Sequence, residues 1–128
     1  MKKIALIAVA AAFAIVGSQA QAAGDVAAGQ KSATQKCATC HDMTSKKQNK
    51  VGPYLWGISG AALGKVEGFK YSENHLKAGG EIKAWDDANL DKYLEAPAKV
   101  IPNNKMAFAG LKDAAERANV IEFLKTLK

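Results

Sequence analysis

Apolar positions follow a helical period near the two ends of the 128-residue chain and lose it in between. The clearest helix is the last, where Asp113 and Glu116 have the spacing of a capping box. The apolar stripe that follows the capping box consists of Val120, Ile121, Leu124 and Leu127. Near the other end, Asp25 is a candidate N-cap for an alanine-rich helix that runs to about Lys36. The pattern therefore predicts one helix early in the folded chain and one at its end.

A third helix is predicted between these two. Either Asp86 or Asp87 can cap it, and it continues through Leu94 and stops before Pro97. Pro97 and Pro102 then bracket a segment that we expect to be extended.

The middle of the chain, residues 42–84, shows no sustained period. Turn signals recur from Gly52-Pro53 to Gly79-Gly80, and only a turn of helix near Ser72 to Lys77 is indicated. A loop of this length is unusual in a compact domain unless it wraps around a large rigid group. Because no segment has convincing strand alternation, we expect an all-α fold of three main helices with long wrapping loops.

Residues 1–22 have the pattern of a secretory signal peptide. Lys2 and Lys3 provide a positive start, Ile4 to Val16 is apolar, and Ala20-Gln21-Ala22 is a small-residue cleavage pattern. The alternative is an uncleaved membrane anchor, but the apolar run is shorter than the ~20 residues that span a bilayer. We therefore predict cleavage after residue 22, a periplasmic location without stable membrane insertion, and one folded domain over residues 23–128.

The charge of the chain indicates the kind of partner it meets. There are 18 Lys and Arg against 12 Asp and Glu, a net charge of +6, and loss of Lys2 and Lys3 with the leader lowers it by two, to +4. A mildly basic domain with lysines on one face suits an acidic protein partner better than nucleic acid.

The strongest chemical signal is the run Cys37-Ala38-Thr39-Cys40-His41. C-x-x-C-H is the signature for covalent attachment of a c-type haem, in which each thiol becomes a thioether and the histidine becomes an axial iron ligand. Cys37 and Cys40 are the only cysteines, so no disulfide stabilises this small domain. A buried porphyrin would supply the missing apolar core.

Two other interpretations of the cysteines remain. A reducible dithiol of the thioredoxin type belongs beside a βαβ pattern, which the sequence lacks. A zinc site needs about four ligands, and Cys37, Cys40, His41 and His75 supply four only by joining distant residues.

The second axial ligand follows by elimination among the residue types that bind haem iron. Met1 leaves with the leader, and Met43 is too close to His41 to reach the opposite face of the porphyrin. Met106 lies far along the chain in a loop that can cross that face, so it is our candidate, with His75 as the alternative.

With these residues in place, the chain resembles the class I cytochromes c, in particular the bacterial cytochrome c2 branch close to mitochondrial cytochrome c. The resemblance runs from Gly24 to the C-terminus. Its markers are Gly24-Asp25-Val26, Cys37 to His41, Gly52-Pro53, Gly68-Phe69-Lys70-Tyr71, Trp85, Tyr93-Leu94, Pro97 and Lys105 to Gly110.

The resemblance implies roles for the haem pocket. The carbonyl of Pro53 would accept a hydrogen bond from Nδ1 of His41, and Tyr71 and Trp85 would donate to a buried haem propionate.

Further along the chain, the resemblance would place Tyr93 near the sulfur of Met106. Phe108 would close the pocket, and Gly29 would lie where the first and last helices cross.

Three residues depart from the family pattern. Ala33 replaces a common aromatic residue at the helix crossing, which predicts a less filled contact. Ala61 replaces an arginine near a propionate, which would then be more exposed or held by another residue such as His75. Ala98 replaces a lysine on the docking face.

The resemblance implies a soluble, monomeric electron carrier rather than an enzyme, working between a quinol–cytochrome c oxidoreductase and a terminal oxidase, a reaction centre or a reductase. The alternatives are a haem enzyme with an open sixth position and a dithiol oxidoreductase without haem. The lysines expected to dock acidic redox partners around the haem edge are Lys36, Lys50, Lys99, Lys105 and Lys112.

Overall fold

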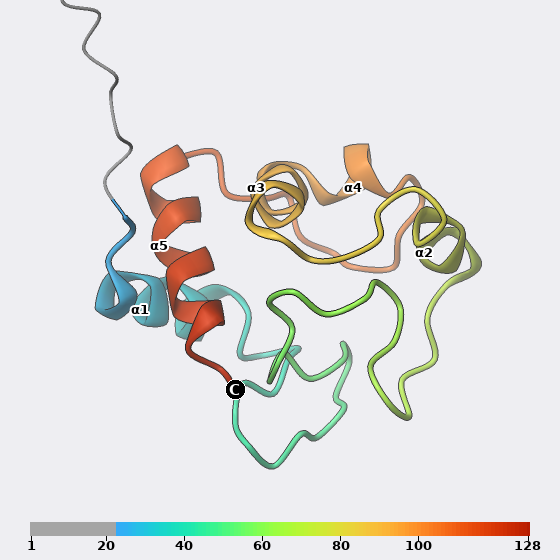
Figure 1. Ribbon diagram of the computed structural model, residues 1–128, viewed down its shortest axis with the longest axis horizontal. Helices are drawn as coiled ribbons and strands as arrows, with labels where there is room; N and C mark the ends of the chain where they lie inside the picture. Colours follow the sequence, from blue (N-terminus) through green and yellow to red (C-terminus); the bar gives the residue numbers. More distant parts are fainter. Residues whose placement is uncertain (1–22) are drawn as a thin grey trace, which may run out of the picture.

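The chain folds into helices joined by long loops, as its hydrophobic pattern predicts (Figure 1). The computed structural model describes residues 23–128, so the predicted signal peptide lies outside the described residues. The three long helices are α1 (Val26–Lys36), α3 (Asp87–Glu95) and α5 (Ala114–Lys125). Within residues 23–128 the strand-like pairing is limited to one isolated antiparallel bridge between Ala62 and Ala84. The predicted all-α class with three main helices is therefore confirmed.

Each long helix begins at an aspartate. The carboxylates of Asp25, Asp86 and Asp113 each accept a hydrogen bond of 2.7–2.8 Å from the amide three residues later. An aspartate at this position satisfies a free amide and favours the positive end of the helix dipole. Of the two residues that the sequence left open for α3, Asp86 is the cap and Asp87 is the first helical residue.

Two short helices complete the set, α2 (Glu73–Ala78) and α4 (Pro97–Val100). The first agrees with the predicted turn of helix. The second, α4, shows that the prediction of an extended segment after Pro97 is wrong. Proline ends α3, but it also suits the first position of a helix, where its fixed φ is correct and its missing N–H is not needed.

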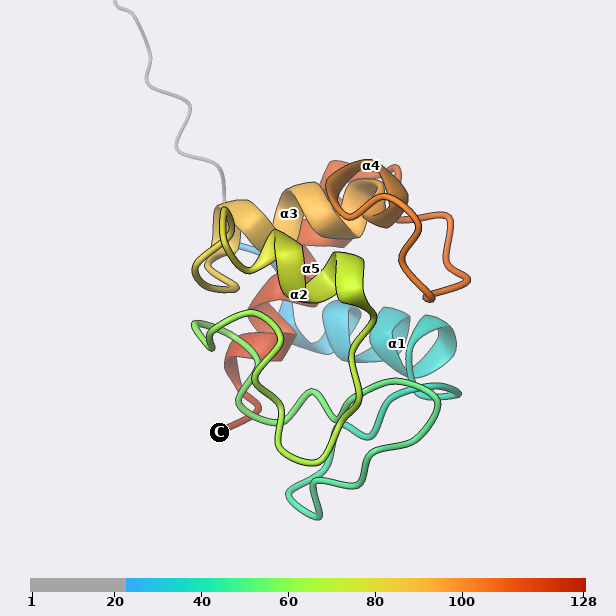
Figure 2. The same cartoon turned by 90° about the vertical axis from the view of Figure 1, so that its right-hand side faces the viewer.

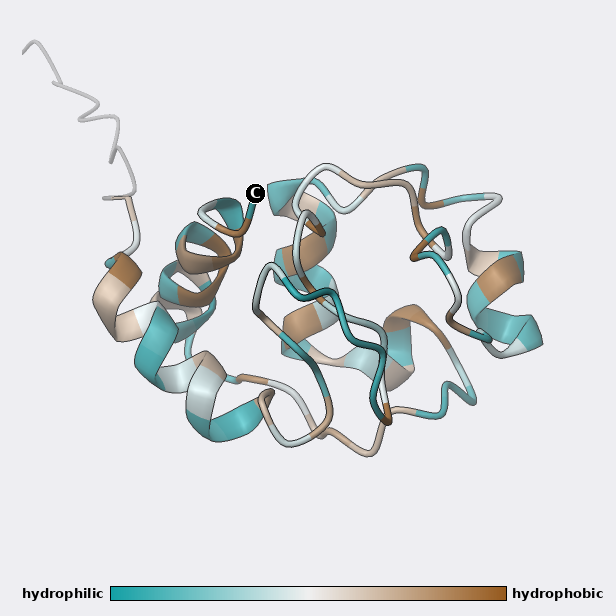
Figure 3. Ribbon diagram, turned by 90° about the horizontal axis from the view of Figure 1, so that it is seen from below, coloured by the Kyte–Doolittle hydropathy of each residue, from teal (hydrophilic) through white to brown (hydrophobic). Residues whose placement is uncertain are grey.

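The core lies where α1 packs against α5 and α5 packs against α3. Polar and apolar positions alternate on these helices in Figure 3, and the buried apolar residues of α5 are Val120, Ile121, Phe123 and Leu124. Ala33 is fully buried at the crossing with α5, so the two helices close over this small side chain. No helix within residues 23–128 is long and apolar enough to cross a membrane.

We expect Gly29→Ala to destabilise the protein by at least ~1 kcal/mol. A Cβ atom at position 29 would overlap the carbonyl group of Asn119 on α5, which is backbone and cannot turn away. This clash opposes the ~1 kcal/mol that alanine normally adds to a helix relative to glycine. The denaturation midpoint of the haem-loaded protein measures the change, with Gln30→Ala on the exposed side of α1 as the control. An unchanged midpoint for Gly29→Ala would show that the crossing is adaptable.

Arg117 connects three parts of the fold. Its side chain is buried, and its Nε donates to Oδ1 of Asp91 on α3 at 2.6 Å. Its Nη1 donates to the carbonyl oxygens of Leu111 and Lys112 at 3.0 and 3.1 Å. The segment that leads into α5 is thereby fixed to both α3 and α5.

Candidate functional site

The C-x-x-C-H run forms one tight turn directly after α1. Cys37 caps the C-terminus of α1, with its amide bonded to the carbonyl of Ala33, and the amides of Cys40 and His41 both donate to the carbonyl of Cys37, at 3.0 and 2.9 Å. Both thiols are free and half-buried. The turn therefore brings two thiols and one imidazole to the same end of α1.

The environment of the thiols does not support a redox dithiol. Burial raises the pKa of Cys37, and the nearby Lys36 opposes this more weakly. Thioredoxin-type exchange requires the opposite, a lowered thiol pKa. A zinc site is not supported either, because no group of three His, Cys, Asp or Glu residues within the described part of the chain could hold a metal ion.

The ring of His41 is held in one orientation. Its Nδ1 lies 2.6 Å from the carbonyl oxygen of Pro53, the hydrogen bond that the resemblance implies. This bond places the proton on Nδ1 and leaves the lone pair on Nε2 free to bind a metal. Burial lowers the pKa of His41 more than the Pro53 bond raises it, which favours the neutral, ligating form.

Gly52 allows the chain to pass close to this ring. A Cβ atom at position 52 would overlap the His41 imidazole, and the amide of Gly52 donates to the carbonyl of Cys40 at 2.8 Å. The sequence identified Gly52-Pro53 as a turn, and it did not reveal that the absence of a side chain makes room for His41.

Met106 is half-buried in the loop between α4 and α5. Its amide donates to Oδ1 of Asn104 at 2.9 Å, and its carbonyl accepts from the amide of Phe108 at 2.9 Å. Further on, Gly110 has a φ of +100° and lies so close to the carbonyl of Glu95 that a Cβ atom would not fit. The loop is therefore held at both ends.

The views in Figures 1 and 2 agree on where the two candidate ligand segments lie. The segment after α1, which carries the C-x-x-C-H turn, runs along one side of the molecule, and the loop between α4 and α5 runs along the other. This arrangement fits a ligand from each side of a flat group.

Four of the predicted or alternative site residues form a row of rings. Tyr71 stacks on His75 with ring centroids 4.6 Å apart, His75 lies 6.2 Å from Trp85, and Trp85 lies 4.8 Å from Tyr93. Burial raises the pKa of Tyr93 to about 12, so its hydroxyl stays protonated at neutral pH. The sequence did not predict the row, because its members come from three separate segments.

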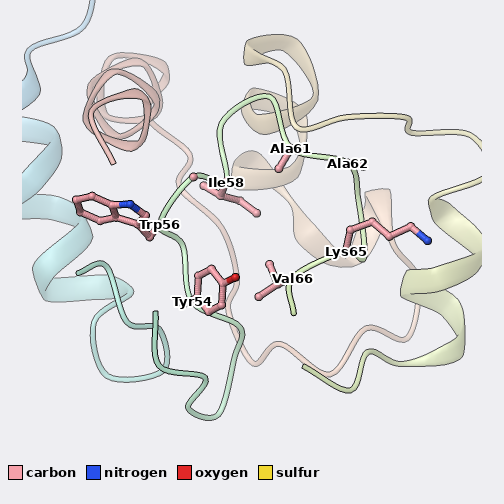
Figure 4. Close-up of a pocket in the computed structure, with 8 residues that line it drawn as sticks. Tyr54, Trp56, Ile58, Ala61, Ala62, Lys65 and Val66 are labelled. Carbon is pink, nitrogen blue, oxygen red and sulfur yellow. The ribbon is translucent and has the colours of Figure 1, made fainter. Parts of the chain in front are cut away.

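Ala61, which stands at the position of a family arginine, lines a pocket of about 120 Å³ (Figure 4). Tyr54, Trp56 and Ile58 line the same pocket. Of the described residues that line it, Lys65 is the one with a charge. Lys65 therefore leaves one positive charge at this pocket, although position 61 has none.

The surrounding residues fit the haem that the motif predicts. Apolar side chains from α3, α4 and the loops pack against the core but are only half-buried. They include Cys37, Met43, Leu55, Trp56, Val66, Ile82, Tyr93, Leu94, Val100 and Phe108. A flat apolar group would complete their burial, and the two thiols and the free imidazole nitrogen have the chemistry to attach and ligate it.

The five predicted docking lysines are exposed but differ in their contacts. Lys36 forms an ion pair with Glu116 at 2.7 Å, Lys50 donates to the carbonyl of Ala38 at 2.5 Å, and Lys112 donates to the carbonyls of Glu95 and Ala109 at 2.6 and 3.0 Å. Lys99 and Lys105 lie beside and within the segment that leads to Met106.

Comparison with known proteins extends these observations. The family model for cytochrome c matches residues 26–128. Cytochrome c2 iso-2 of Magnetospirillum molischianum is 49% identical over 92 residues, covering 72% of this chain and 91% of the relative. Cytochrome c2 of Rhodomicrobium vannielii is 40% identical over 126 residues, covering 98% of this chain and 97% of the relative. Among solved structures, cytochrome cH from Methylobacterium extorquens matches with a TM-score of 0.73 at 38% identity, covering 80% of this chain and 99% of that one.

Proposed function

This chain belongs to the cytochrome c family, and from that premise we propose that it is a soluble, monomeric carrier of single electrons. Its donor is a quinol–cytochrome c oxidoreductase, and its acceptor is a terminal oxidase, a reaction centre or a reductase. The haem c of this family, attached through Cys37 and Cys40, supplies an iron that gains or loses one electron. The observation that carries the proposal is the neutral His41 ring, fixed by Pro53 with Nε2 free.

In this proposal His41 and Met106 are the two axial ligands. The hydrogen bonds of the Met106 amide and carbonyl to Asn104 and Phe108 hold the backbone of the loop that would present the Met106 sulfur. With both positions filled by protein, no site remains for a substrate, which favours electron transfer over catalysis. Tyr71, Trp85, Tyr93 and Phe108 form the pocket walls.

We further propose that residues 1–22 are a cleaved signal peptide and that the domain of residues 23–128 works in the periplasm. The positive start, the apolar run and the small-residue cleavage pattern support this. Mass spectrometry of the exported protein tests it, because the mature chain should begin at Ala23.

The visible and near-infrared spectrum of the purified protein tests the carrier function. A six-coordinate iron with a sulfur ligand gives a weak near-infrared band in the oxidised form, and the reduced protein should be oxidised rapidly by a partner oxidase. High-spin features without that band would instead indicate an enzyme with an open site.

We expect Lys99→Glu with Lys105→Glu to slow the reaction with an acidic partner at low salt by about tenfold or more. These two lysines are the better choice because Lys36→Glu would also break an ion pair and place a second carboxylate beside that of Glu116. Salt screens the attraction, with a screening length of ~8 Å at ~0.15 M, so the rate should depend less on salt in the variant, which has less attraction to lose. Stopped-flow rates at several salt concentrations measure both effects.

The matched control is Lys83→Glu with Lys128→Glu. It changes the net charge equally on segments that flank neither the C-x-x-C-H turn nor the Met106 loop. If both double variants slowed the reaction to the same extent, net charge and not a docking face would explain it.

A further inference from the structure

The loop that presents Met106 has few polar contacts with the rest of the fold. It starts at Ile101, whose side chain is fully buried and fixes that end. Among residues 23–128, one hydrogen bond joins residues 102–108 to a residue outside the loop between α4 and α5. In that bond, Nδ2 of Asn74 on α2 donates to the carbonyl oxygen of Pro102 at 3.0 Å. Asn74 is therefore the polar link between this loop and the rest of the protein.

The carbonyl of Pro102 lies at the tip of a β-turn. The amide of Asn104 donates to the carbonyl of Ile101 at 3.2 Å, which closes the turn. Pro102 and Asn103 are its two central residues, and Asn103 has a φ of +55°. Proline followed by a residue of positive φ is typical of a type II turn. The turn's own hydrogen bond uses the carbonyl of Ile101, so the carbonyl of Pro102 is available to Asn74.

Asn104 connects this turn to Met106. Its Nδ2 donates to the carbonyl of Ile101 at 2.9 Å, and its Oδ1 accepts from the amide of Met106 at 2.9 Å. The side chain of Asn104 thus bridges the start of the turn and the backbone of Met106. A displacement of the turn therefore displaces Met106 as well.

Side-chain packing does not hold the turn against α2. Within residues 23–128, α2 packs against none of the other helices, and Figure 1 shows it at the edge of the molecule beside the loop that follows α4. A pocket of about 300 Å³ lies between the two, with Lys77 of α2 on one side and Asn103 of the turn on the other. The hydrogen bond from Asn74 therefore spans a gap that side chains leave open.

We propose, on the basis of the carrier function above, that Asn74 is a positioning residue for Met106. Its side chain holds the turn of residues 101–104 against α2, and this keeps the sulfur of Met106 on the iron in competition with ligands from solution. Without the bond, the loop opens more often and more molecules have a free sixth position. The net contribution of one hydrogen bond corresponds to a rise of about twofold to tenfold in that open fraction.

The experiment is a titration of the oxidised, haem-loaded protein with imidazole at ~pH 8, where imidazole is mostly uncharged. Imidazole competes with the Met106 sulfur, so its apparent affinity follows the fraction of open molecules, and loss of the near-infrared band reports its binding. Asn74→Ala should bind imidazole about twofold to tenfold more tightly than wild type. Before imidazole is added, the variant should show the band of wild type, because the closed form still predominates.

A second variant, Asn74→Asp, separates the hydrogen bond from the stability of α2. A carboxylate has the size of the amide but cannot donate to the carbonyl of Pro102. In the first turn of a helix it also interacts favourably with the helix dipole, so α2 itself is not weakened. If Asn74 only supported α2, this variant would bind imidazole as wild type does. The proposal instead predicts that it binds imidazole at least as tightly as Asn74→Ala.

Asn89→Ala is the matched control. Asn89 is also half-buried in the first turn of a helix, α3, and its Nδ2 donates to the carbonyl of Ala84 at 2.8 Å. That carbonyl is not part of the loop that carries Met106, so this variant should bind imidazole with the affinity of wild type.

Equal imidazole affinities in wild type, Asn74→Ala and Asn74→Asp would overturn the role of Asn74. An equal gain in Asn89→Ala would also overturn it, because any lost hydrogen bond would then have the same effect. The near-infrared band of wild type before imidazole is added tests the carrier function separately. Its absence would reject the sulfur ligand itself, whereas its presence together with equal affinities would reject only the role of Asn74.

Discussion

Met106→Ala is expected to leave the haem attached and to lower the reduction potential by on the order of 0.1 V or more, within the ~0.8 V range that axial ligands span. The thioether bonds do not involve Met106, so attachment should be unaffected. Loss of the sulfur ligand removes the preference for reduced iron that a His/Met pair provides. The near-infrared band should disappear, and peroxidase activity should rise because hydrogen peroxide can reach the vacated position.

Met43→Ala is the matched control for this prediction. Met43 is also half-buried and packs against the core, but it lies only two residues beyond His41. We expect the near-infrared band and the reduction potential of Met43→Ala to resemble those of wild type. If the band survives in Met106→Ala and is lost in Met43→Ala, the ligand role belongs to Met43.

The second large effect concerns folding. Cys37→Ala with Cys40→Ala should leave the chain mostly unfolded, because five large apolar side chains depend on the haem for much of their burial. These are Leu55, Trp56, Tyr93, Leu94 and Phe108. Full burial of such a side chain contributes ~1.5–3 kcal/mol, so completing five half-burials contributes about 4–8 kcal/mol, an upper value. A domain of this size has a total stability of only ~5–15 kcal/mol.

Circular dichroism with thermal melting measures this effect. Thr39→Ala, which changes the exposed residue between the cysteines and keeps both thiols, should fold and melt like wild type. A double cysteine variant with wild-type helix content and a cooperative melt would show that the helices do not need the haem.

The helices that were predicted correctly carry their signals within a few neighbouring residues. Asp25 and Asp113 lie next to the helices they cap, so their role is visible in the sequence. The helix after Pro97 was missed because proline can end one helix and begin the next, and its flanking residues do not decide between these roles.

Some features of the candidate site could likewise be predicted from neighbouring residues, and others could not. The C-x-x-C-H spacing reveals its chemistry directly, and elimination was enough to select Met106 as a candidate. The close approach of Gly52 to His41 and the stacking of His75 on Tyr71 depend on how separate loops meet. No local sequence pattern specifies such contacts between separate loops. The sequence therefore identified these residues but did not predict which of them are in contact.

The pairing of α1 with α5 has a consequence for how the protein is made. The first helix of the domain finds its partner only in the last helix, so the native core cannot close until almost the whole chain has been synthesised. The cysteines directly follow α1, so this core does not enclose them until α5 has packed against that helix. A truncation that removes α5 should therefore still accept haem, yet should remain susceptible to proteases, because attachment precedes closure.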